Sequence, residues 1–433
     1  MSEKESKEEE NKEEVGVKKE ENGMNWILVF IIGLGFFTTA ITWGLYNSYV
    51  PIFLDEIIIT HNRWFKLLYP WENTFIGIVM VLDNIAAITL QPYIGARSDK
   101  TWTKYGRRMP YLLIGIPLAA FFFIFIPVVK DLILLLFIIT IFNISMALYR
   151  APTVALMPDL VPSKHRSKAN GVINFMGGVG AIYAYIIGAL IYKTQGPVAA
   201  FLYTSILMLI ALLIMSAYIR EPEVPLSPEE EEKMGIINAF KEVLFDEDRS
   251  GLYMLLAIMF WFFGFNVIET WFTMYGKYVI GVNEADAAMA LAGFIIFFVL
   301  FSIPAGFIAN KIGRRKTIII GLVGLIIVMF LAIPIRNLRT LAILLTIGGM
   351  FWAFININSI VIVWEIGGEK KLGAYTGLYY FFSMLAAIVS PPTAGLIFDI
   401  TGREIMFPLV TIYMIIALIF MFGVKRGEYS GGH

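Results

Sequence analysis

The sequence has no cysteine and only three histidines in 433 residues. The absence of cysteine excludes disulfides, zinc–thiolate sites, iron–sulfur clusters and cysteine nucleophiles. His61, His165 and His433 fall in predicted loops or tails, which leaves too few for a histidine metal site. The sequence therefore predicts neither a metal site nor a resident cofactor.

Charged side chains are also scarce, at 16% of the residues, whereas soluble domains have roughly a quarter. Hydrophobic residues make up 58% of the chain, which excludes a soluble enzyme and indicates a membrane protein. A spanning helix needs roughly 20 apolar residues, so this content supplies about twelve helices. The 34 basic and 34 acidic residues cancel, and no nucleic-acid partner is expected.

Apolar runs broken by polar residues, glycine or proline predict an all-α membrane protein with twelve transmembrane helices. The predicted helices cover residues 24–50, 73–96, 110–129, 132–160, 169–192, 198–219, 251–279, 286–309, 317–334, 338–363, 372–398 and 404–424. Loops on alternate sides of these helices hold twenty and eight Lys or Arg residues. By the positive-inside rule, the richer side and both termini are expected in the cytoplasm, with the chain as a multi-pass protein of the cell's inner membrane.

The chain divides into two helical halves with a linker between them. Residues 24–220 and 251–426 form the predicted six-helix bundles, and residues 427–433 form a short tail. Residues 1–23 are a Glu/Lys run without the apolar content for a core, so a disordered tail is expected there. In the linker, 221–250, Ser227, Pro228 and Glu230 have the pattern of a helix start. An amphipathic helix on the cytoplasmic surface is therefore expected.

An internal repeat supports this division. The segment PYIGARSDKTWTKYGRRMP follows the second predicted helix, and PAGFIANKIGRRK follows the eighth. Matching positions lie 206 or 207 residues apart: Arg107 and Arg314, Asp159 and Glu365, Gly171 and Gly377. Two parallel repeats of six helices are typical of carriers whose substrate site lies between the halves near the membrane midplane.

The two loop segments resemble the loop signature of the major facilitator superfamily. The segments WGLYNSYVPIF, LDNIAAITLQPYIGARSDK and RAPTVALMPDLVPSKHRSKANG are similar to bacterial relatives of the sucrose carriers, within the glycoside–pentoside–hexuronide cation symporters. This resemblance implies uptake of a sugar or glycoside, a di- or oligosaccharide by preference, driven by a proton or sodium gradient. The second signature has Asn310 where the first has Asp99, so any charge lock there must be asymmetric.

Three ionisable residues lie well inside the predicted spans: Asp83, Arg150 and Glu269. Each is about ten residues, or roughly 15 Å, from a helix end, which is close to the midplane of a bilayer core about 30 Å thick. Buried ionisable groups in membranes are functional candidates by default. We expect Arg150 and Asp83 to organise the substrate site and Glu269 to carry the coupling cation, with Asp83 as the other coupling candidate. Alternatively, Arg150 and a carboxylate could form a buried pair that only locks helix packing.

Sugars need amides or charges for their hydroxyl groups and aromatic rings for their C–H faces. The predicted substrate-binding residues are Trp43, Tyr46, Asn47, Asp83, Asn84, Arg150, Asn174, Asn266, Trp271 and Asn356. With 35 Phe, 20 Tyr and 9 Trp in the chain, most rings must serve packing or face lipid.

A second group of charges lies at the predicted cytoplasmic helix ends. Asp99, Arg107 and Arg108 are near the end of the helix that carries Asp159, and Arg314 and Glu365 repeat the pattern. We expect these charges to act in gating, by holding the halves closed on the cytoplasmic side. The alternative is an anchor of solvated charges.

The leading hypothesis is a monomeric, proton-coupled sugar uptake carrier that rocks its two halves around one site in the bilayer. A sodium-coupled sugar symporter and an exporter of lipophilic compounds are the alternatives within transport. A membrane enzyme or channel is not supported, because the sequence has no nucleotide loop, nucleophile–histidine pair or filter-like repeat.

Overall fold

The computed structural model describes residues 24–61, 69–162, 165–221, 236–368 and 371–427. The predicted tails, 1–23 and most of 427–433, lie outside these residues, as does the expected helix start at Ser227. The described part of the chain consists of helices and connecting turns. They are α2 Trp26–His61, η2 Tyr69–Trp71, α3 Glu72–Met80, α4 Leu82–Asp99, α5 Met109–Phe125, α6 Leu132–Leu160, α7 Arg166–Ile182, η4 Tyr183–Gly188, α8 Ala189–Gln195, α9 Pro197–Tyr218, α10 Ile236–Phe245, α11 Ser250–Tyr275, η5 Gly276–Ile280, α12 Glu284–Ile312, α13 Arg314–Ala332, α14 Leu338–Gly367, α15 Leu372–Thr401, η7 Arg403–Ile405 and α16 Met406–Gly423.

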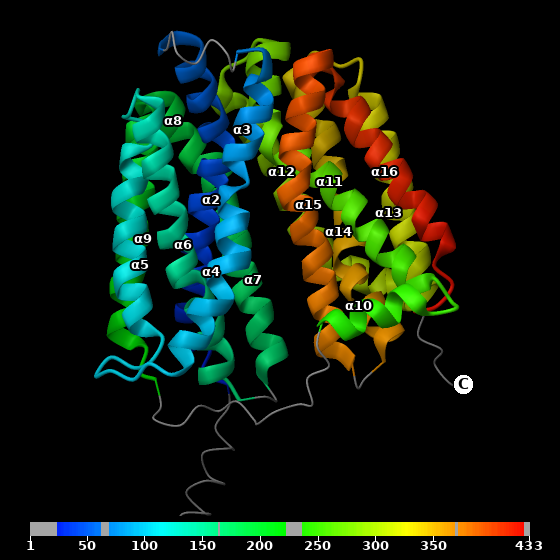
Figure 1. The fold of residues 1–433 in the computed structure, drawn as a ribbon, viewed down its shortest axis with the longest axis horizontal. Coiled ribbons are helices and arrows are strands. Elements are labelled where there is room, and N and C mark those ends of the chain that lie inside the picture. Colours follow the sequence, from blue (N-terminus) through cyan, green and yellow to red (C-terminus); the bar gives the residue numbers. More distant parts are fainter. Residues whose placement is uncertain (1–23, 62–68, 163–164, 222–235, 369–370, 428–433) are drawn as a thin grey trace, which may run out of the picture.

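Eleven segments among the described residues are long and apolar enough to cross a membrane. Met109–Phe125 is a shorter apolar helix and corresponds to the third predicted span. The all-α membrane fold expected from composition and hydrophobic runs is therefore confirmed. Helices α2 to α9 lie together in one group and α11 to α16 in a second group beside it (Figure 1). We call these groups the first half and the second half.

Two predicted helices differ from the structure, one in where it ends and the other in being broken into two. The first helix continues from residue 50 to His61, with Pro51 inside it. A proline removes one backbone donor and bends a helix, but packing on both sides of Pro51 keeps this one continuous. The span predicted at 73–96 is two helices, α3 and α4, which meet at Val81. This break places Asp83 in the first turn of α4.

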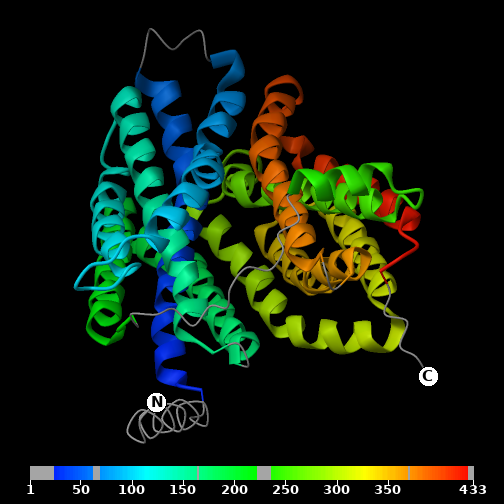
Figure 2. The same cartoon turned by 60° about the horizontal axis from the view of Figure 1, so that its bottom comes forward.

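The linker contains a helix, as expected, but it lies against the second half. Helix α10 runs across that half at an angle to the spanning helices (Figures 1 and 2) and contacts α15 and α11. Ala239 and Val243 are buried there, and the Phe240 ring lies 6.2 Å from that of Phe382. The helix is therefore fixed to one half.

The two repeated loops share a glycine with a positive φ angle. Gly106 and Gly313 both have positive φ angles, of 102° and 96°, directly before the paired arginines. Glycine adopts this conformation without steric cost, which explains why each signature has glycine before its arginines. We call the end of the molecule that carries these arginines the basic end, and the other the opposite end.

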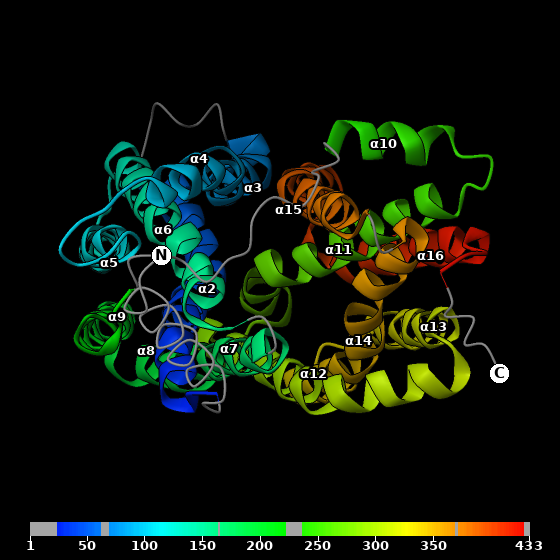
Figure 3. The same cartoon turned by 90° about the horizontal axis from the view of Figure 1, so that it is seen from below.

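The halves contact each other through α3 and α15, through α2 and α11, and through α12 with α7, η4 and α8. Seen from the basic end, α7 lies beside α12, and α3 and α4 lie beside α15 (Figure 3). Helix α3 packs closely on α15, where Gly77 faces the backbone of Pro391 and Gly395 faces the backbone of Asn73. These contacts lie toward the opposite end.

Candidate functional site

A polar cavity lies between the halves at the depth predicted for the substrate site. It has a volume of about 220 Å³, and residues of both halves line it. They are Trp43, Asn47, Met80, Asp83, Asn84, Arg150, Asn266, Glu269, Thr270, Ala387 and Pro391. The structure thus brings together the three predicted membrane-embedded charges, three of the predicted amides and one predicted tryptophan.

The charged groups of the cavity are held in different ways. The amide of Asn84 donates to Oδ1 of Asp83 at 2.9 Å, and the amide of Asn47 donates to Oε1 of Glu269 at 3.2 Å. The second of these bonds connects the two halves. Asp83 lies in the first turn of α4, directly after the end of α3.

Arg150 is exposed and has no hydrogen bond or ion pair with any residue that the structure describes. The alternative in which Arg150 forms a buried pair that locks helix packing is therefore not found. Its guanidinium has five N–H donors and remains charged under working conditions. Arg150 can thus donate several hydrogen bonds to a solute in the cavity.

Four predicted substrate-binding residues do not line this cavity. Tyr46 is 0% exposed and stacks on Phe142, and Trp271 is 1% exposed with its ring edge-on to that of Phe398. Asn174 is exposed on α7, where its amide donates to the carbonyl of Asn170 in the same helix. Asn356 lies on α14, outside the set of residues that line the cavity. The cavity instead includes Met80, Thr270, Ala387 and Pro391, of which only Thr270 belongs to a polar stripe visible in the sequence.

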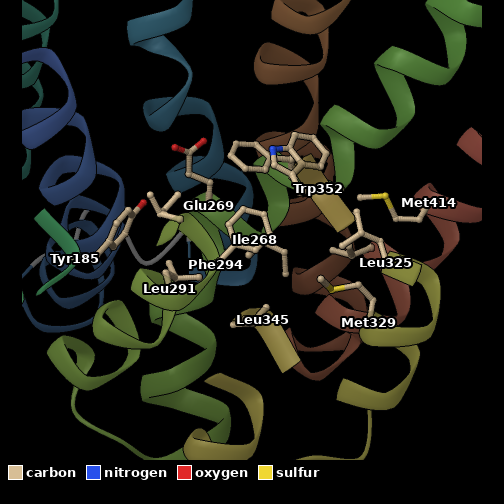
Figure 4. A pocket seen from close by; sticks show the side chains of 14 residues that line it. Tyr185, Ile268, Glu269, Leu291, Phe294, Leu325, Met329, Leu345, Trp352 and Met414 are labelled. Carbon is tan, nitrogen blue, oxygen red and sulfur yellow. The ribbon is translucent and has the colours of Figure 1, made fainter. Parts of the chain in front are cut away.

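A second, apolar cavity of about 60 Å³ adjoins the first at Glu269. Figure 4 shows Glu269 at its edge, with the carboxylate turned away from the Leu325, Met329 and Met414 side chains. Trp352 lines this cavity and stacks on Phe265, with ring centroids 4.8 Å apart. Glu269 therefore lies between a polar and an apolar environment.

The predicted gating charges pair within each half. Asp159 forms ion pairs with Arg107 at 2.5 Å and with Arg108 at 2.9 Å, and Arg108 also pairs with Asp99. In the second half, Arg314 pairs with Glu365 at 3.0 Å. The expectation that these charges join the halves is therefore wrong for this conformation, because each pair ties neighbouring helices of one half. A role for them in the conformational change stays a prediction.

Apart from the Asn47–Glu269 bond in the cavity, the main polar contacts between the halves lie at the opposite end, and none of them was predicted from the sequence. Arg403 of η7 pairs with Asp55 at 2.6 Å and with Glu72 at 3.2 Å. The Asp399 carboxylate accepts the backbone N–H groups of Asn73 and Thr74, both at 2.9 Å. Between the described residues of the two halves, no ion pair or hydrogen bond occurs at the basic end. The molecule is thus closed at the opposite end.

Asp55 lies in the part of α2 beyond the predicted helix end, so its position could not be seen from the predicted spans. In the sequence, Arg403 is one of the eight basic residues in the loops of this side. A helix prediction continued past Pro51 would have placed Asp55 near the membrane surface as a buried acid in need of a partner.

The family model of the Major Facilitator Superfamily matches residues 32–293 and 277–431. This chain belongs to the major facilitator superfamily. Membership makes it a secondary transporter and not an enzyme. The chain's two groups of helices, its repeated loop signature and its central cavity agree with the membership.

Several transport and resistance proteins are similar in sequence to this chain. A cis,cis-muconate transport protein of Acinetobacter baylyi is 25% identical over 284 residues, which cover 64% of this chain and 68% of the relative. A class H tetracycline resistance protein of Pasteurella multocida is 24% identical over 294 residues, 65% of this chain and 67% of the relative. A sucrose transport protein of Arabidopsis thaliana is 25% identical over 169 residues, 34% of this chain and 26% of the relative.

The fold is also similar to solved structures of the superfamily. A bacterial homologue of the human lysosomal transporter Spinster, in an inward-facing and unoccupied conformation, aligns with a TM-score of 0.74 and 14% identity over 95% of this chain and 100% of that one. At this identity the likeness shows the fold alone. It confirms the arrangement that the loop signature implied.

Proposed function

We propose that this superfamily member takes up a sugar or glycoside by symport with a proton, through alternating access of the cavity between its halves. The observation that carries the proposal is the cavity itself, with two carboxylates, one guanidinium, three amides and Trp43 around one space. Such a lining offers both donors and acceptors to sugar hydroxyls and a ring to a sugar face. The sucrose transport protein among the relatives supports this substrate class.

The size of the cavity favours a compact solute. A volume of about 220 Å³ is below the roughly 300–1,000 Å³ of pockets that enclose drug-sized ligands. A single sugar ring suits this space, so a di- or oligosaccharide would place one ring in the cavity and extend the rest toward the basic end. One copy of the chain contains the whole cavity, which supports function as a monomer.

For the orientation, we propose that the basic end faces the cytoplasm of a cell whose inner membrane holds the chain. The excess of Lys and Arg in the loops at that end supports this placement. The conformation described above is then inward-facing. A single cysteine at Lys104 has no native thiol to compete with it and should resist an impermeant maleimide added outside intact cells, whereas one at Lys130 should react. Rapid labelling of the cysteine at position 104 would show that the basic end faces outward instead.

An organic anion is the second candidate substrate. Arg150 is a cation without a partner among the described residues and lines the cavity, so it could bind a carboxylate. The muconate transport protein among the relatives supports this class. Against it, Asp83 and Glu269 would repel an anion unless both were protonated or paired with cations.

Uptake into proteoliposomes tests these classes directly. Radiolabelled monosaccharides, disaccharides, muconate and tetracycline should be offered under imposed proton or sodium gradients. The proposal expects accumulation of a sugar with the proton gradient, and accumulation with sodium alone would identify sodium as the coupling ion. Movement of muconate or tetracycline without any sugar would contradict the sugar assignment.

A matched pair of asparagine variants connects transport to the cavity. Asn266 and Asn174 each donate to a carbonyl one turn back in their own helix, at 2.7 and 2.8 Å, but only Asn266 lines the cavity. Asn266→Ala should weaken substrate binding about tenfold, as expected for the loss of one or two hydrogen bonds, whereas Asn174→Ala should transport normally. Equal effects of the two variants would show that the cavity is not the substrate site.

A further inference from the structure

A third pocket, of about 660 Å³, lies at the opposite end, away from the substrate cavity. Its lining comes from α8 of the first half and from η5, α12, the turn before α14 and the start of α14 in the second half. It includes three cations, Lys193, Arg336 and Arg339, and one acid, Asp286. The loops at this end hold only eight Lys or Arg residues, against twenty at the basic end. Three of the eight line this one pocket, and the positive-inside rule does not explain that concentration.

The cations of this pocket are only partly neutralised. Lys193 pairs with Asp286 across the halves at 2.6 Å. Arg336 donates through Nη1 to the Tyr275 hydroxyl at 3.1 Å and to the Ile333 carbonyl at 2.8 Å, which fixes its guanidinium at the pocket. Arg339 has no hydrogen bond or ion pair with the described part of the chain. Two guanidinium groups therefore remain without a carboxylate.

The shape of the surrounding surface favours an amphiphilic ligand. Ile343 and Ile347 follow Arg339 at four-residue steps on α14, so they lie on the same helix face, and both are exposed, Ile343 by 63%. This apolar strip leads from the pocket into the membrane span. Guanidinium groups match the geometry of phosphate oxygens. An ester whose phosphate contacts the arginines could lay its acyl chain along the strip.

We propose that this pocket binds a phosphate-bearing anion, such as the head group of an anionic phospholipid, and that the bound anion stabilises the conformation closed at the opposite end. The reason is that Lys193 of the first half adds its charge to this pocket only while it lies beside the second half. A ligand that binds one of two conformations shifts the equilibrium toward it.

The test measures the opening of the basic end in nanodiscs. Spin labels on Lys168→Cys of α7 and Lys311→Cys of α12 report the distance between the halves, and no native cysteine competes with them. Replacing part of the phosphatidylcholine with phosphatidylglycerol should raise the ratio of open to closed basic ends about fivefold or more. Inorganic phosphate added to phosphatidylcholine discs distinguishes a free anion from a lipid as the source.

Two variants and one control locate the effect. Arg339→Gln alone should reduce the shift, and Arg339→Gln together with Arg336→Gln should abolish it. Arg339 has no polar bond with any described residue, so its replacement removes no such bond. Lys130→Gln removes an exposed cation of the same end outside the pocket and should leave the shift intact. No shift with either lipid or phosphate, or an equal shift in the double variant, would overturn the proposal. The readout needs no transport substrate, so it is independent of the sugar assignment.

Discussion

Glu269 lines both the polar and the apolar cavity, and it contacts the first half through Asn47. Apolar neighbours keep water away from a carboxylate and make its charged form costly. Whether Glu269 is charged therefore depends on what occupies the polar cavity. Arg150 cannot fill this role, because its guanidinium stays charged. Under the proposed proton symport, Glu269 is therefore the better candidate for the coupling residue.

The first prediction concerns this residue. Glu269→Gln keeps the size and the hydrogen bond to Asn47 but cannot exchange a proton, so gradient-driven accumulation should fall at least 100-fold while sugar exchange across the membrane persists. Exchange and accumulation in the same proteoliposomes measure the two. Glu284→Gln, at a carboxylate that accepts from Tyr192 away from the cavity, is the control. Normal accumulation in Glu269→Gln would place the coupling site elsewhere, and Asp83 would then be the next residue to test.

The sequence predicted most of this site because helix geometry relates its residues. Asn266 and Glu269 are three positions apart and share a face, as do Trp43 and Asn47 at four positions. Trp271 follows Glu269 by two residues, about 200° around the helix, so it points away and packs on α15. The same geometry could have excluded Trp271. The rotation of α7 and α14, which leaves Asn174 and Asn356 outside, depends on tertiary packing that a single helix does not encode.

At the scale of elements, the contact between α3 and α15 joins the halves most tightly. A β-carbon at Gly77 would lie 2.5 Å from the carbonyl oxygen of Pro391, and one at Gly395 would meet the backbone of Asn73. Backbone atoms cannot move aside as flexible side chains do. The close approach of these helices therefore requires glycine at both positions.

The second prediction follows from this contact. Gly77→Ala should force α3 from α15 and favour opening of the opposite end, so a cysteine in the cavity should react several times faster with reagent from that end. Gly373→Ala on α15 is the matched control, because its β-carbon would meet nothing within 4 Å. Each change gains at most about 1 kcal/mol of helix propensity, so an opening seen only in Gly77→Ala is due to the contact. Equal reactivity in the two variants would contradict this account.

The number of spanning helices could be read from hydropathy, because twelve apolar runs need twelve crossings. The break at Val81 and the passage of α2 through Pro51 could not, since both depend on neighbouring helices that satisfy or cover the disturbed backbone. The break matters for the site, because it places Asp83 at a helix start.

At the scale of the whole molecule, Arg403 connects the halves through a nearly dry cluster. Its partner Asp55 is 0% exposed, and Arg403 itself is 14% exposed. Removing one member of a buried pair leaves an uncompensated charge, at a cost of about 3–5 kcal/mol. The repeat predicted two halves, but not which end closes, because a carrier's sequence must encode both conformations.

The third prediction tests this cluster. Arg403→Gln leaves Asp55 unpaired only in the conformation closed at the opposite end, so the equilibrium should shift strongly toward opening there. Distances between spin labels across that end measure the shift. Adding Asp55→Asn removes the buried charge and should recover part of the closed population. If Arg403→Gln leaves the distances unchanged, the α3–α15 contact alone holds this end.

The charges around the polar cavity also bear on stoichiometry. Two carboxylates and one guanidinium give a net charge of −1 when all are ionised. Enclosing a net charge in a space of low dielectric constant is costly. The carrier should therefore change between its inward-open and outward-open conformations most readily when one cation has bound. A neutral sugar would then move with one proton, and its transport would carry one positive charge. Reversal potentials on a supported membrane should give a ratio near one, and a ratio of two would require Asp83 to titrate as well.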